Sequence, residues 1–203
     1  MIRLAIALSL AFAGTADAKT QKAVLAGGCF WCVESNFESV PGVKGVLSGY
    51  TGGTSQNPTY DDHGGHYEAV QITYDDAKIS YAEIVAKFLR STDVVDAGGQ
   101  FCDRGKAYRS AIFVSDTAQK QVAKDEVARA EADLGQKIVT PIVAAKTFWP
   151  AEDYHQNYYK SSEIVLTRRG PKEKSSAYKF YRDACGRDAR VRQLWGSSAE
   201  FLH

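Results

Sequence analysis

The segment GGCFWC at residues 27–32 brings two glycines, two aromatic rings and two thiols together. A short apolar run precedes it and a helical pattern follows it, so Cys29 is predicted at the start of a helix. Free backbone N–H groups and the positive end of the helix dipole stabilise a thiolate there, and lower the pKa of a cysteine from about 8.5. The glycines let the backbone or a ligand approach closely. We therefore predict that Cys29 is a nucleophile, with Cys32 one helical turn later as a candidate disulfide partner.

Two bulky side chains, Phe30 and Trp31, flank this thiol. Aromatic residues belong more often to a core than to a pocket, but at a helix start their side chains project toward the same mouth as the thiol. A wall of two large rings suits an apolar, polarisable group such as the methyl of a thioether. The pattern thus indicates a nucleophilic sulfur with an apolar wall beside it.

Other functions of a Cys-x-x-C pair stay open at this point. Cys29 and Cys32 could form a structural disulfide, the active site of a thioredoxin-like oxidoreductase, or half of a zinc site. Thioredoxin-like folds place this motif after a full β-α-β unit, whereas here it follows a single predicted strand. A zinc site would need a second pair of ligands, and the near candidates, His63 and His66, lie in a glycine-rich loop without ligand spacing. We therefore expect no metal.

The elements that must position these residues follow from the hydrophobic pattern. Alternating or apolar runs predict four strands, at 21–26, 43–50, 67–74 and 108–114. Helical spacing predicts one helix over 31–39 and another after Ser80, which forms a capping box with Glu83. Residues 51–66 are mostly turn residues and predict a long loop of the kind that often carries function. The order βαββαβ predicts an α+β fold, a ferredoxin-like sandwich with helices over one face of an antiparallel sheet.

The rest of the chain extends this domain. A helix is predicted over 117–134, ending at Gly135, and a further strand over 141–148. From about residue 150 on there are few periodic signals, and we expect an irregular tail that wraps the domain. No repeat or low-complexity linker interrupts residues 19–203, so we expect a single domain there.

Residues 1–18 differ in character from the rest. Arg3 precedes an apolar run over 4–13, and Ala16 and Ala18 give the small-x-small pattern of a cleavage site. This predicts a secretory signal peptide, since the run is too short to span a bilayer; an uncleaved membrane anchor is the competing interpretation. We expect an exported, most simply periplasmic, protein without membrane contact after cleavage.

Charge excludes some partners. The chain has 25 Lys and Arg against 24 Asp and Glu, so nothing indicates a field for nucleic acid or an acidic membrane surface. Basic residues gather near the C-terminus, but acidic residues are interspersed, which is typical of a solvated face. All four cysteines follow the predicted signal peptide, in a compartment that permits disulfides.

Five motifs show that the sequence resembles the peptide methionine sulfoxide reductase A family. They are GCFWCVE at 28–34, NPTYDD at 57–62, GHYEAVQI at 65–72, YRSAIF at 108–113 and FWPAEDYHQNYY at 148–159. The resemblance runs from about residue 22 to residue 160, which is most of the chain after the predicted signal peptide. One such motif is weakly specific, whereas five in family order are very specific.

The resemblance implies reduction of the S epimer of methionine sulfoxide, free or in proteins, without metal or flavin. It also implies roles for residues of this chain. Cys29 matches the family's nucleophile, and Glu68 matches the acid that protonates the sulfoxide oxygen. The other matches are the methyl-binding wall, the two tyrosines hydrogen-bonded to the oxygen, and an aspartate of the substrate pocket: Phe30 and Trp31, Tyr60 and Tyr108, and Asp103.

This chemistry explains why these residue types belong together. As a thiolate attacks the sulfur, the sulfoxide oxygen becomes basic, and a group nearby must give it a proton. A carboxylic acid kept neutral by an apolar site can do so, and tyrosine hydroxyls add donors. Cys29 is then left as a sulfenic acid, which a second cysteine converts to a disulfide.

Three cysteines compete as the resolving residue. Cys185 lies on the C-terminal tail, where the family usually has this cysteine, and is the preferred candidate. Cys32 is close by necessity, although many members have glycine there, and a disulfide between residues i and i+3 at a helix start is strained and easily reduced. Cys102, beside Asp103, is the third candidate.

An external dithiol must finally reduce the disulfide, and the resemblance implies a thioredoxin-like reductant rather than a bound cofactor. Cytosolic thioredoxin cannot meet an exported enzyme, so we expect a thioredoxin-like carrier fed across the inner membrane. An active site within one domain allows a monomer. These expectations describe an enzyme that repairs oxidatively damaged exported proteins.

Overall fold

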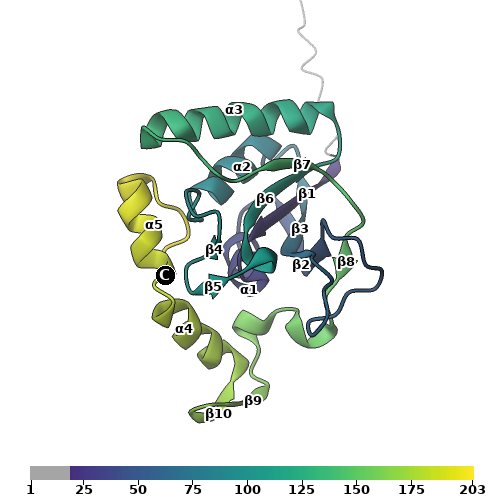
Figure 1. Ribbon diagram of the computed structural model, residues 1–203, viewed down its shortest axis with the longest axis vertical. Helices are drawn as coiled ribbons and strands as arrows, with labels where there is room; N and C mark the ends of the chain where they lie inside the picture. Colours follow the sequence, from purple (N-terminus) through teal and green to yellow (C-terminus); the bar gives the residue numbers. More distant parts are fainter. Residues whose placement is uncertain (1–18) are drawn as a thin grey trace, which may run out of the picture.

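The computed structural model describes residues 19–203, so the predicted signal peptide lies outside the described residues. Within them, a six-stranded sheet runs in the order β7-β6-β1-β3-β2-β8 (Figure 1). Its strands are β1 (Thr20–Gly27), β2 (Val43–Thr51), β3 (Tyr67–Asp75), β6 (Ser110–Val114), β7 (Ile142–Ala144) and β8 (Trp149–Pro150). Two hairpins lie outside this sheet: β4 (Gly99–Gln100) with β5 (Asp103–Arg104), and β9 (Ile164–Thr167) with β10 (Gly170–Glu173).

The four strands predicted first form the centre of the sheet. β1 pairs antiparallel with β3 on one side and with β6 on the other, and β3 pairs antiparallel with β2. The helix α1 (Phe30–Phe37) connects β1 to β2, and α2 (Tyr81–Leu89) follows β3. The strand expected over 141–148 is shorter, and β7 pairs parallel with β6. The prediction of an α+β fold is confirmed.

One face of the sheet carries the main hydrophobic core. Side chains alternate between the two faces of a sheet along each strand, so Val70 and Ile72 of β3 point to the same face. Both pack in one core with Leu25 of β1 and the helices. The helices contribute Phe30, Val33, Phe37, Ile84, Val85 and Phe88, each at most 1% exposed. Because Glu68 precedes Val70 by two positions, the same alternation places it on the helix-covered face.

Local signals set the helix ends as predicted. At the start of α2, the Ser80 hydroxyl accepts from the N–H of Glu83, and the Glu83 carboxylate accepts from the N–H of Ser80 at 2.8 Å. The helix α3 (Thr117–Leu134) ends at Gly135, whose φ is +66°. In Figure 1, α3 crosses the top of the view beside α2. None of the helices in the described part of the chain is long and apolar enough to cross a membrane.

The irregular tail expected after residue 150 is wrong in part, because this region contains the β9–β10 hairpin and two helices, α4 (Lys174–Ala184) and α5 (Arg187–Trp195). The buried positions of α4 are Lys174, Tyr178 and Arg182, four residues apart. The helical period is therefore present, but polar residues carry it, and hydrophobic spacing alone does not detect it. Short 3-10 turns complete the chain, at Lys106–Tyr108, Asp153–His155, Tyr158–Lys160 and Gly196–Ser198.

Candidate active site

Cys29 lies at the junction between β1 and α1, where it caps the N-terminus of the helix, as predicted. Its carbonyl oxygen accepts hydrogen bonds from the N–H groups of Cys32 and Val33, at 3.1 and 3.4 Å. The chain reaches this position through Gly28, whose φ of +82° lies in the region that favours glycine. A Cβ at Gly28 would lie only 2.5 Å from the Cβ of Gln100. The turn that presents the thiol therefore depends on glycine.

The residues predicted from the sequence converge on one small cavity of about 50 Å³. Its lining consists of Cys29, Phe30, Trp31, Tyr60, Glu68, Asp103, Tyr108 and Tyr181. Every predicted site residue other than the resolving-cysteine candidates is among them, and Tyr181 is the one addition. The Cys29 side chain is 5% exposed, so the thiol faces this cavity rather than open solvent. A cavity of this size can hold a small polar group with one methyl, but not a whole amino acid.

Glu68 projects from β3 onto the face where α1 begins, and it is 1% exposed. Its Oε2 accepts a hydrogen bond from the N–H of Phe30 at 3.0 Å. Burial raises the pKa of Glu68 to about 8, although this hydrogen bond opposes the shift. The carboxyl group is therefore mostly protonated at neutral pH and can donate a proton to a ligand in the cavity. The simpler interpretation, that Glu68 faces water at the start of its strand, is wrong.

Tyr60 and Tyr108 reach the cavity from two different connections. Tyr60 lies between β2 and β3, and its backbone N–H donates to Oε1 of Glu152 at 2.9 Å. The other carboxylate oxygen of Glu152 accepts from the Tyr50 hydroxyl at 3.0 Å, so the loop is held to β2. Burial raises the pKa of Tyr60 to about 12 and also raises the pKa of Tyr108. Both hydroxyls therefore keep their protons and remain donors.

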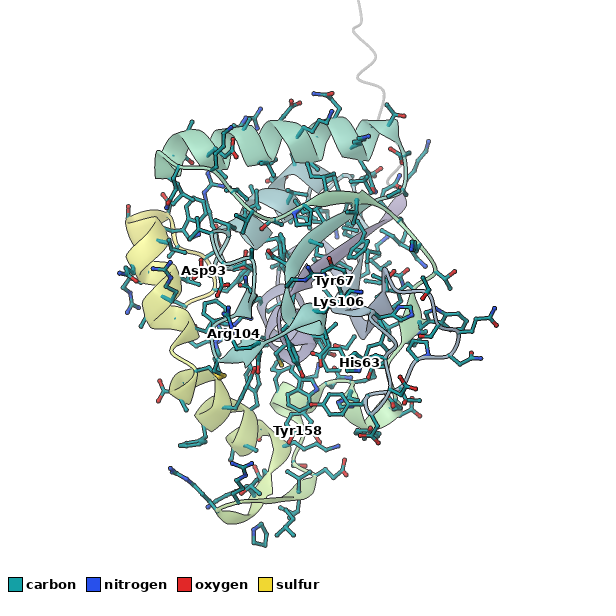
Figure 2. All side chains as sticks on the ribbon, in the orientation of Figure 1. His63, Tyr67, Asp93, Arg104, Lys106 and Tyr158 are labelled. Carbon is teal, nitrogen blue, oxygen red and sulfur yellow. A yellow bond between two sulfur atoms is a disulfide. The ribbon has the colours of Figure 1, made fainter. Side chains whose placement is uncertain are left out.

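The Phe30–Trp31 wall is supported by further rings. The Trp31 indole stacks on Tyr158, with ring centroids 3.8 Å apart and planes 10° from parallel, and Figure 2 labels Tyr158. The indole meets Tyr181 at an angle of 86°. His155 packs on both Phe30 and Trp31, with centroid distances of 5.1 and 5.6 Å. Burial lowers the pKa of His155 to about 4, so this ring is neutral. The wall is thus held in place by neutral aromatic neighbours.

The far end of the chain completes the cavity. The Tyr181 hydroxyl of α4 donates a hydrogen bond to Oδ2 of Asp103. One helical turn later, Cys185 forms a disulfide with Cys102, the neighbour of Asp103. Burial raises the pKa of both Asp103 and Tyr181. The helix α4 is therefore tied at two adjacent points, and it brings Tyr181 into the site.

Cys29 and Cys32 are buried free thiols one helical turn apart, and each affects the pKa of the other. The prediction of a lowered pKa for Cys29 is wrong for this state, because burial, Cys32 and the nearby carboxyl groups all raise the pKa of Cys29. The lowered pKa belongs to Cys32, at about 6, chiefly because of its interaction with the Cys29 thiol. Of the two thiols, Cys32 therefore ionises more readily.

Positive charge from α4 and α5 adds to this effect. The guanidinium groups of Arg187 and Arg182 both lower the pKa of Cys32. Arg182 has a carboxylate partner, Asp188, at 2.7 Å. Arg187 is 2% exposed, donates to the carbonyl oxygen of Gly27 at 2.8 Å, and forms no ion pair with any residue that the structure describes. A buried cation without a carboxylate partner favours an anion nearby, and the Cys32 thiolate is such an anion.

The candidates for the resolving cysteine fall into two groups. Cys102 and Cys185 are bonded to each other, so neither offers a free thiol. Cys32 is free, lies one helical turn from Cys29 and packs in the same buried cluster. The sequence alone prefers Cys185, whereas this arrangement favours Cys32.

The histidines considered as zinc ligands stabilise the loop at 51–66 instead. His66 is 2% exposed; its Nδ1 accepts from the N–H of Gly53 at 3.2 Å, and its Nε2 donates to the carbonyl oxygen of Ser55 at 2.9 Å. Nδ1 of His63 lies 2.9 Å from the carbonyl oxygen of Tyr60. Across residues 19–203, no group of three or more His, Cys, Asp or Glu side chains is placed to hold a metal ion. A larger hollow of about 950 Å³ beside α4 contains none of the predicted site residues.

Several residues of the site were not predicted. Tyr158 and His155 lie in the motif FWPAEDYHQNYY, so the fifth block of the family resemblance was a signal for them. Tyr181 and Arg187 lie outside all five motifs, and no local pattern marks them. They reach the site only because α4 and α5 fold back over it.

Comparison with known proteins supports one family. The family model for peptide methionine sulfoxide reductase matches residues 21–191. The chain is 50% identical over 184 residues to peptide methionine sulfoxide reductase MsrA 2 of Rhizobium meliloti (strain 1021), an alignment covering 90% of this chain and 87% of that protein. Mxr1 of Saccharomyces cerevisiae in its reduced form has a TM-score of 0.64 and 26% identity, over 70% of this chain and 88% of that one. Mxr1 in complex with Trx2 shares the fold, with a TM-score of 0.50 and 23% identity over 73% and 91% of the two chains.

The fold and the site define a thiol-dependent reductase, in which a cysteine pair lies beside a neutral acid. The comparisons identify the family within this class of reductases. The chain belongs to the peptide methionine sulfoxide reductase A family, and it is a reductase of methionine sulfoxide.

Proposed function

We propose that the enzyme reduces the S epimer of methionine sulfoxide, free or in proteins, with Cys29 as the nucleophile. The observation that carries this proposal is the convergence of Cys29, Glu68 and Trp31 on one cavity of about 50 Å³. The rings offer contact for the methyl group, while the acid and the tyrosine hydroxyls offer hydrogen bonds to the oxygen. The thiol between them is placed to reach the sulfur.

In the first step, the Cys29 sulfur attacks the sulfur of the sulfoxide. Its proton passes to the Cys32 thiolate, because Cys32 lies one helical turn away and has the lower pKa of the two. Glu68 gives its proton to the sulfoxide oxygen, and Tyr60 and Tyr108 stabilise the developing charge. The protonated oxygen then moves to the Cys29 sulfur as a hydroxyl group, and both the sulfur–oxygen bond of the substrate and the new bond between the two sulfurs break. The substrate sulfur is reduced by two electrons to a thioether, while Cys29 is oxidised to a sulfenic acid.

In the second step, we propose that Cys32 resolves the sulfenic acid. The Cys32 sulfur attacks the Cys29 sulfur, a disulfide forms, and the oxygen leaves as water. Cys32 is favoured over Cys185 because Cys32 is free and adjacent, whereas Cys185 is bonded to Cys102. A disulfide between residues i and i+3 is readily reduced, which suits a bond that must be broken in every turnover.

An external dithiol, rather than a metal or a flavin, supplies the electrons in this proposal. Family membership supports such a reductant, and Mxr1 of Saccharomyces cerevisiae has been solved in complex with Trx2. The partner that we propose for this chain is a thioredoxin-like protein of the compartment to which the chain is exported.

The cellular role belongs to the same proposal. The predicted signal peptide supports export, most simply to the periplasm, and repair of oxidised exported proteins there. The Cys102–Cys185 disulfide fits an oxidising compartment. The antiparallel order β6-β1-β3-β2 supports the ferredoxin-like description of one domain over 19–203. Since residues of one chain line the whole cavity, a monomer can be active.

The proposal is tested with the mature chain and dithiothreitol. Wild-type protein should reduce the S but not the R epimer of methionine sulfoxide, and Cys29→Ser should abolish turnover. Retained turnover in Cys29→Ser would exclude the mechanism. A general thiol–disulfide oxidoreductase would instead reduce insulin and leave both sulfoxides unchanged.

The resolving cysteine is tested by mass spectrometry after one turnover without reductant. We expect a Cys29–Cys32 disulfide in the wild type and in Cys185→Ser. Cys32→Ser should stop at a sulfenic acid that dimedone traps. A disulfide between Cys29 and Cys185 would show instead that the C-terminal cysteine resolves the intermediate.

A further inference from the structure

A second hollow of about 330 Å³ adjoins the catalytic cavity. The two share Trp31 and Tyr60. The rest of its lining comes from the segment 154–174, namely Tyr154, His155, Tyr158, Glu163, Val165 and Lys174. Figure 2 shows Tyr158 between the sheet and the β9–β10 hairpin. Because two rings belong to both spaces, a ligand can extend from one into the other along them.

The walls of this hollow are mostly aromatic and partly open to solvent. The Tyr154 ring is 50% exposed and the Tyr60 ring 36% exposed. Both pack on the His155 ring, at centroid distances of 4.2 and 4.5 Å. Large rings left exposed around a concave surface are typical of a binding site for an apolar group.

The charged residues of the hollow are paired with each other. Lys174 is 4% exposed, and its Nζ donates to Oε2 of Glu163 at 2.5 Å and to the carbonyl oxygen of Tyr154 at 3.0 Å. The same Nζ lies 5.5 Å from the centre of the Tyr158 ring. Since this positive charge already has partners, the hollow favours a neutral occupant over an ionised one.

Polar ring atoms of two residues that line this hollow are buried and lack partners. Nε1 of Trp31 and both ring nitrogens of His155 form no hydrogen bond within the described residues. A neutral imidazole offers one donor and one acceptor, and an indole offers one donor. These atoms have almost no accessible surface, so the walls present rings rather than polar atoms to an occupant. A free amino acid would place an ammonium and a carboxylate group against such walls, whereas the adjoining part of a peptide chain is uncharged.

We propose that this hollow is a subsite for the residue next to methionine sulfoxide in a peptide chain, and that it takes a large apolar or aromatic side chain. The proposal rests on the proposed function, because it treats the smaller cavity as the sulfoxide site. A peptide fills both spaces, whereas free methionine sulfoxide fills one. The enzyme is therefore a better reductase for peptides with such a neighbour than for the free amino acid.

The test compares blocked dipeptides in which methionine-S-sulfoxide precedes or follows phenylalanine or alanine. For at least one order, wild-type kcat/KM should be about tenfold higher with phenylalanine than with alanine. Val165→Trp, which fills the hollow from β9, should abolish this preference. Ile164→Trp is the matched control, because Ile164 is 61% exposed and neighbouring residues of a strand point to opposite faces. It should keep the wild-type preference.

A second variant covers the case in which a new ring at position 165 disturbs folding. Tyr154→Ala removes one wall from the exposed side and should also lower the preference. Equal kcat/KM for the phenylalanine and alanine peptides in the wild type would overturn the subsite, as would a preference that survives in both variants. The reductase activity itself would then stand. Absence of turnover of every sulfoxide, the free amino acid included, would instead overturn the proposed function.

Discussion

At the scale of single residues, two acids near the cavity have pKa values shifted in opposite directions. Glu68 keeps its proton because burial outweighs the hydrogen bond from the N–H of Phe30. The pKa of Cys32 is lowered by its interaction with the Cys29 thiol and by the positive charge of Arg187. A neutral acid and a charged thiolate therefore coexist between about pH 6 and about pH 8.

This coexistence predicts a bell-shaped pH dependence of kcat/KM. The rate should rise as Cys32 deprotonates near pH 6 and fall as Glu68 deprotonates near pH 8. Glu68→Gln removes the proton donor, so it should lower kcat about 10²- to 10⁴-fold and eliminate the alkaline limb. Steady-state rates of both proteins across the pH range measure this. An alkaline limb that persists in Glu68→Gln would assign the limb to another group.

The same carboxyl group links folding to pH. The pKa of Glu68 is about 8 in the folded protein and about 4.3 in an unfolded chain, so the folded state binds the extra proton between these values. The Glu68 contribution to the free energy of unfolding is therefore full below the unfolded pKa and is lost as pH rises through the folded pKa. Over this window, urea denaturation should show a smaller loss of stability in Glu68→Gln than in the wild type.

Substitution of Arg187 tests whether its positive charge lowers the pKa of Cys32. Arg187→Met should raise the pKa of Cys32 above its value of about 6, by on the order of one unit. Arg187→Lys keeps the positive charge and should retain most of the wild-type value. The ultraviolet absorbance of the thiolate, followed against pH with the Cys102–Cys185 disulfide intact, measures the change. An unchanged titration in Arg187→Met would contradict the role.

At the scale of elements, the site is built where strands and helices begin and end. β1 ends at Gly27 and α1 begins at Phe30, so Cys29 lies in the short turn between them. Glu68 is the second residue of β3, and Asp103 is the first of β5. Packed elements therefore hold the backbone of each group, while the side chains stay free to meet in one cavity.

Gly28 is the most constrained position of the turn before Cys29. Gly28→Ala should lower the free energy of unfolding by about 3 kcal/mol. The new Cβ would meet Gln100, and the alanine backbone would have to adopt a positive φ. Gly135→Ala is the matched control: its φ is +66° and nothing lies within 4 Å. Gly135→Ala should lower the free energy of unfolding by about 1 kcal/mol. Urea denaturation measures both, and equal losses would show that the contact with Gln100 costs nothing.

Local sequence patterns predict the elements that carry the proposed catalytic residues. The alternating pattern of residues 67–74 predicts the strand that bears Glu68. The pair Gly27-Gly28 predicts the turn before Cys29. The capping box of α2 follows from Ser80 and Glu83 alone. These features depend on residues close together in sequence, so no knowledge of the packed molecule is needed.

The features that sequence does not predict depend on contacts between distant segments. The direction of the Cys29 pKa shift was predicted wrongly, because the helix dipole is a local feature whereas burial is not. The contact of Tyr181 with Asp103 joins residues 78 positions apart. Buried Lys174 and Arg182 carry part of the helical period of α4, so hydrophobic spacing alone does not reveal this helix.

At the scale of the whole molecule, the Cys102–Cys185 disulfide joins two segments 83 positions apart. The enclosed chain includes β6, α3 and the β9–β10 hairpin. The crosslink also fixes α4, which carries Tyr181 into the catalytic cavity. Its loss should therefore affect both global stability and the closure of the site.

Cys185→Ser should lower the free energy of unfolding by about 4 kcal/mol, because a crosslink over so long a loop restricts the unfolded chain. Wild-type protein in reductant should unfold at the same denaturant concentration as this variant. The double variant Cys102→Ser/Cys185→Ser should match the single variant. Full wild-type stability in Cys185→Ser would show that the crosslink adds no constraint.

The arrangement of rings and donors around the Cys29 sulfur has a stereochemical consequence. A sulfoxide sulfur carries a methyl group, an oxygen, a longer chain and a lone pair, so it has two configurations, which in methionine sulfoxide are epimers. In the proposed function the methyl rests on Trp31 and the oxygen meets Glu68, so the two epimers must send their longer chains in different directions. A space of about 50 Å³ leaves little room for both. The proposed function therefore predicts that the room left for the chain selects the epimer, and that widening this space relaxes the selection.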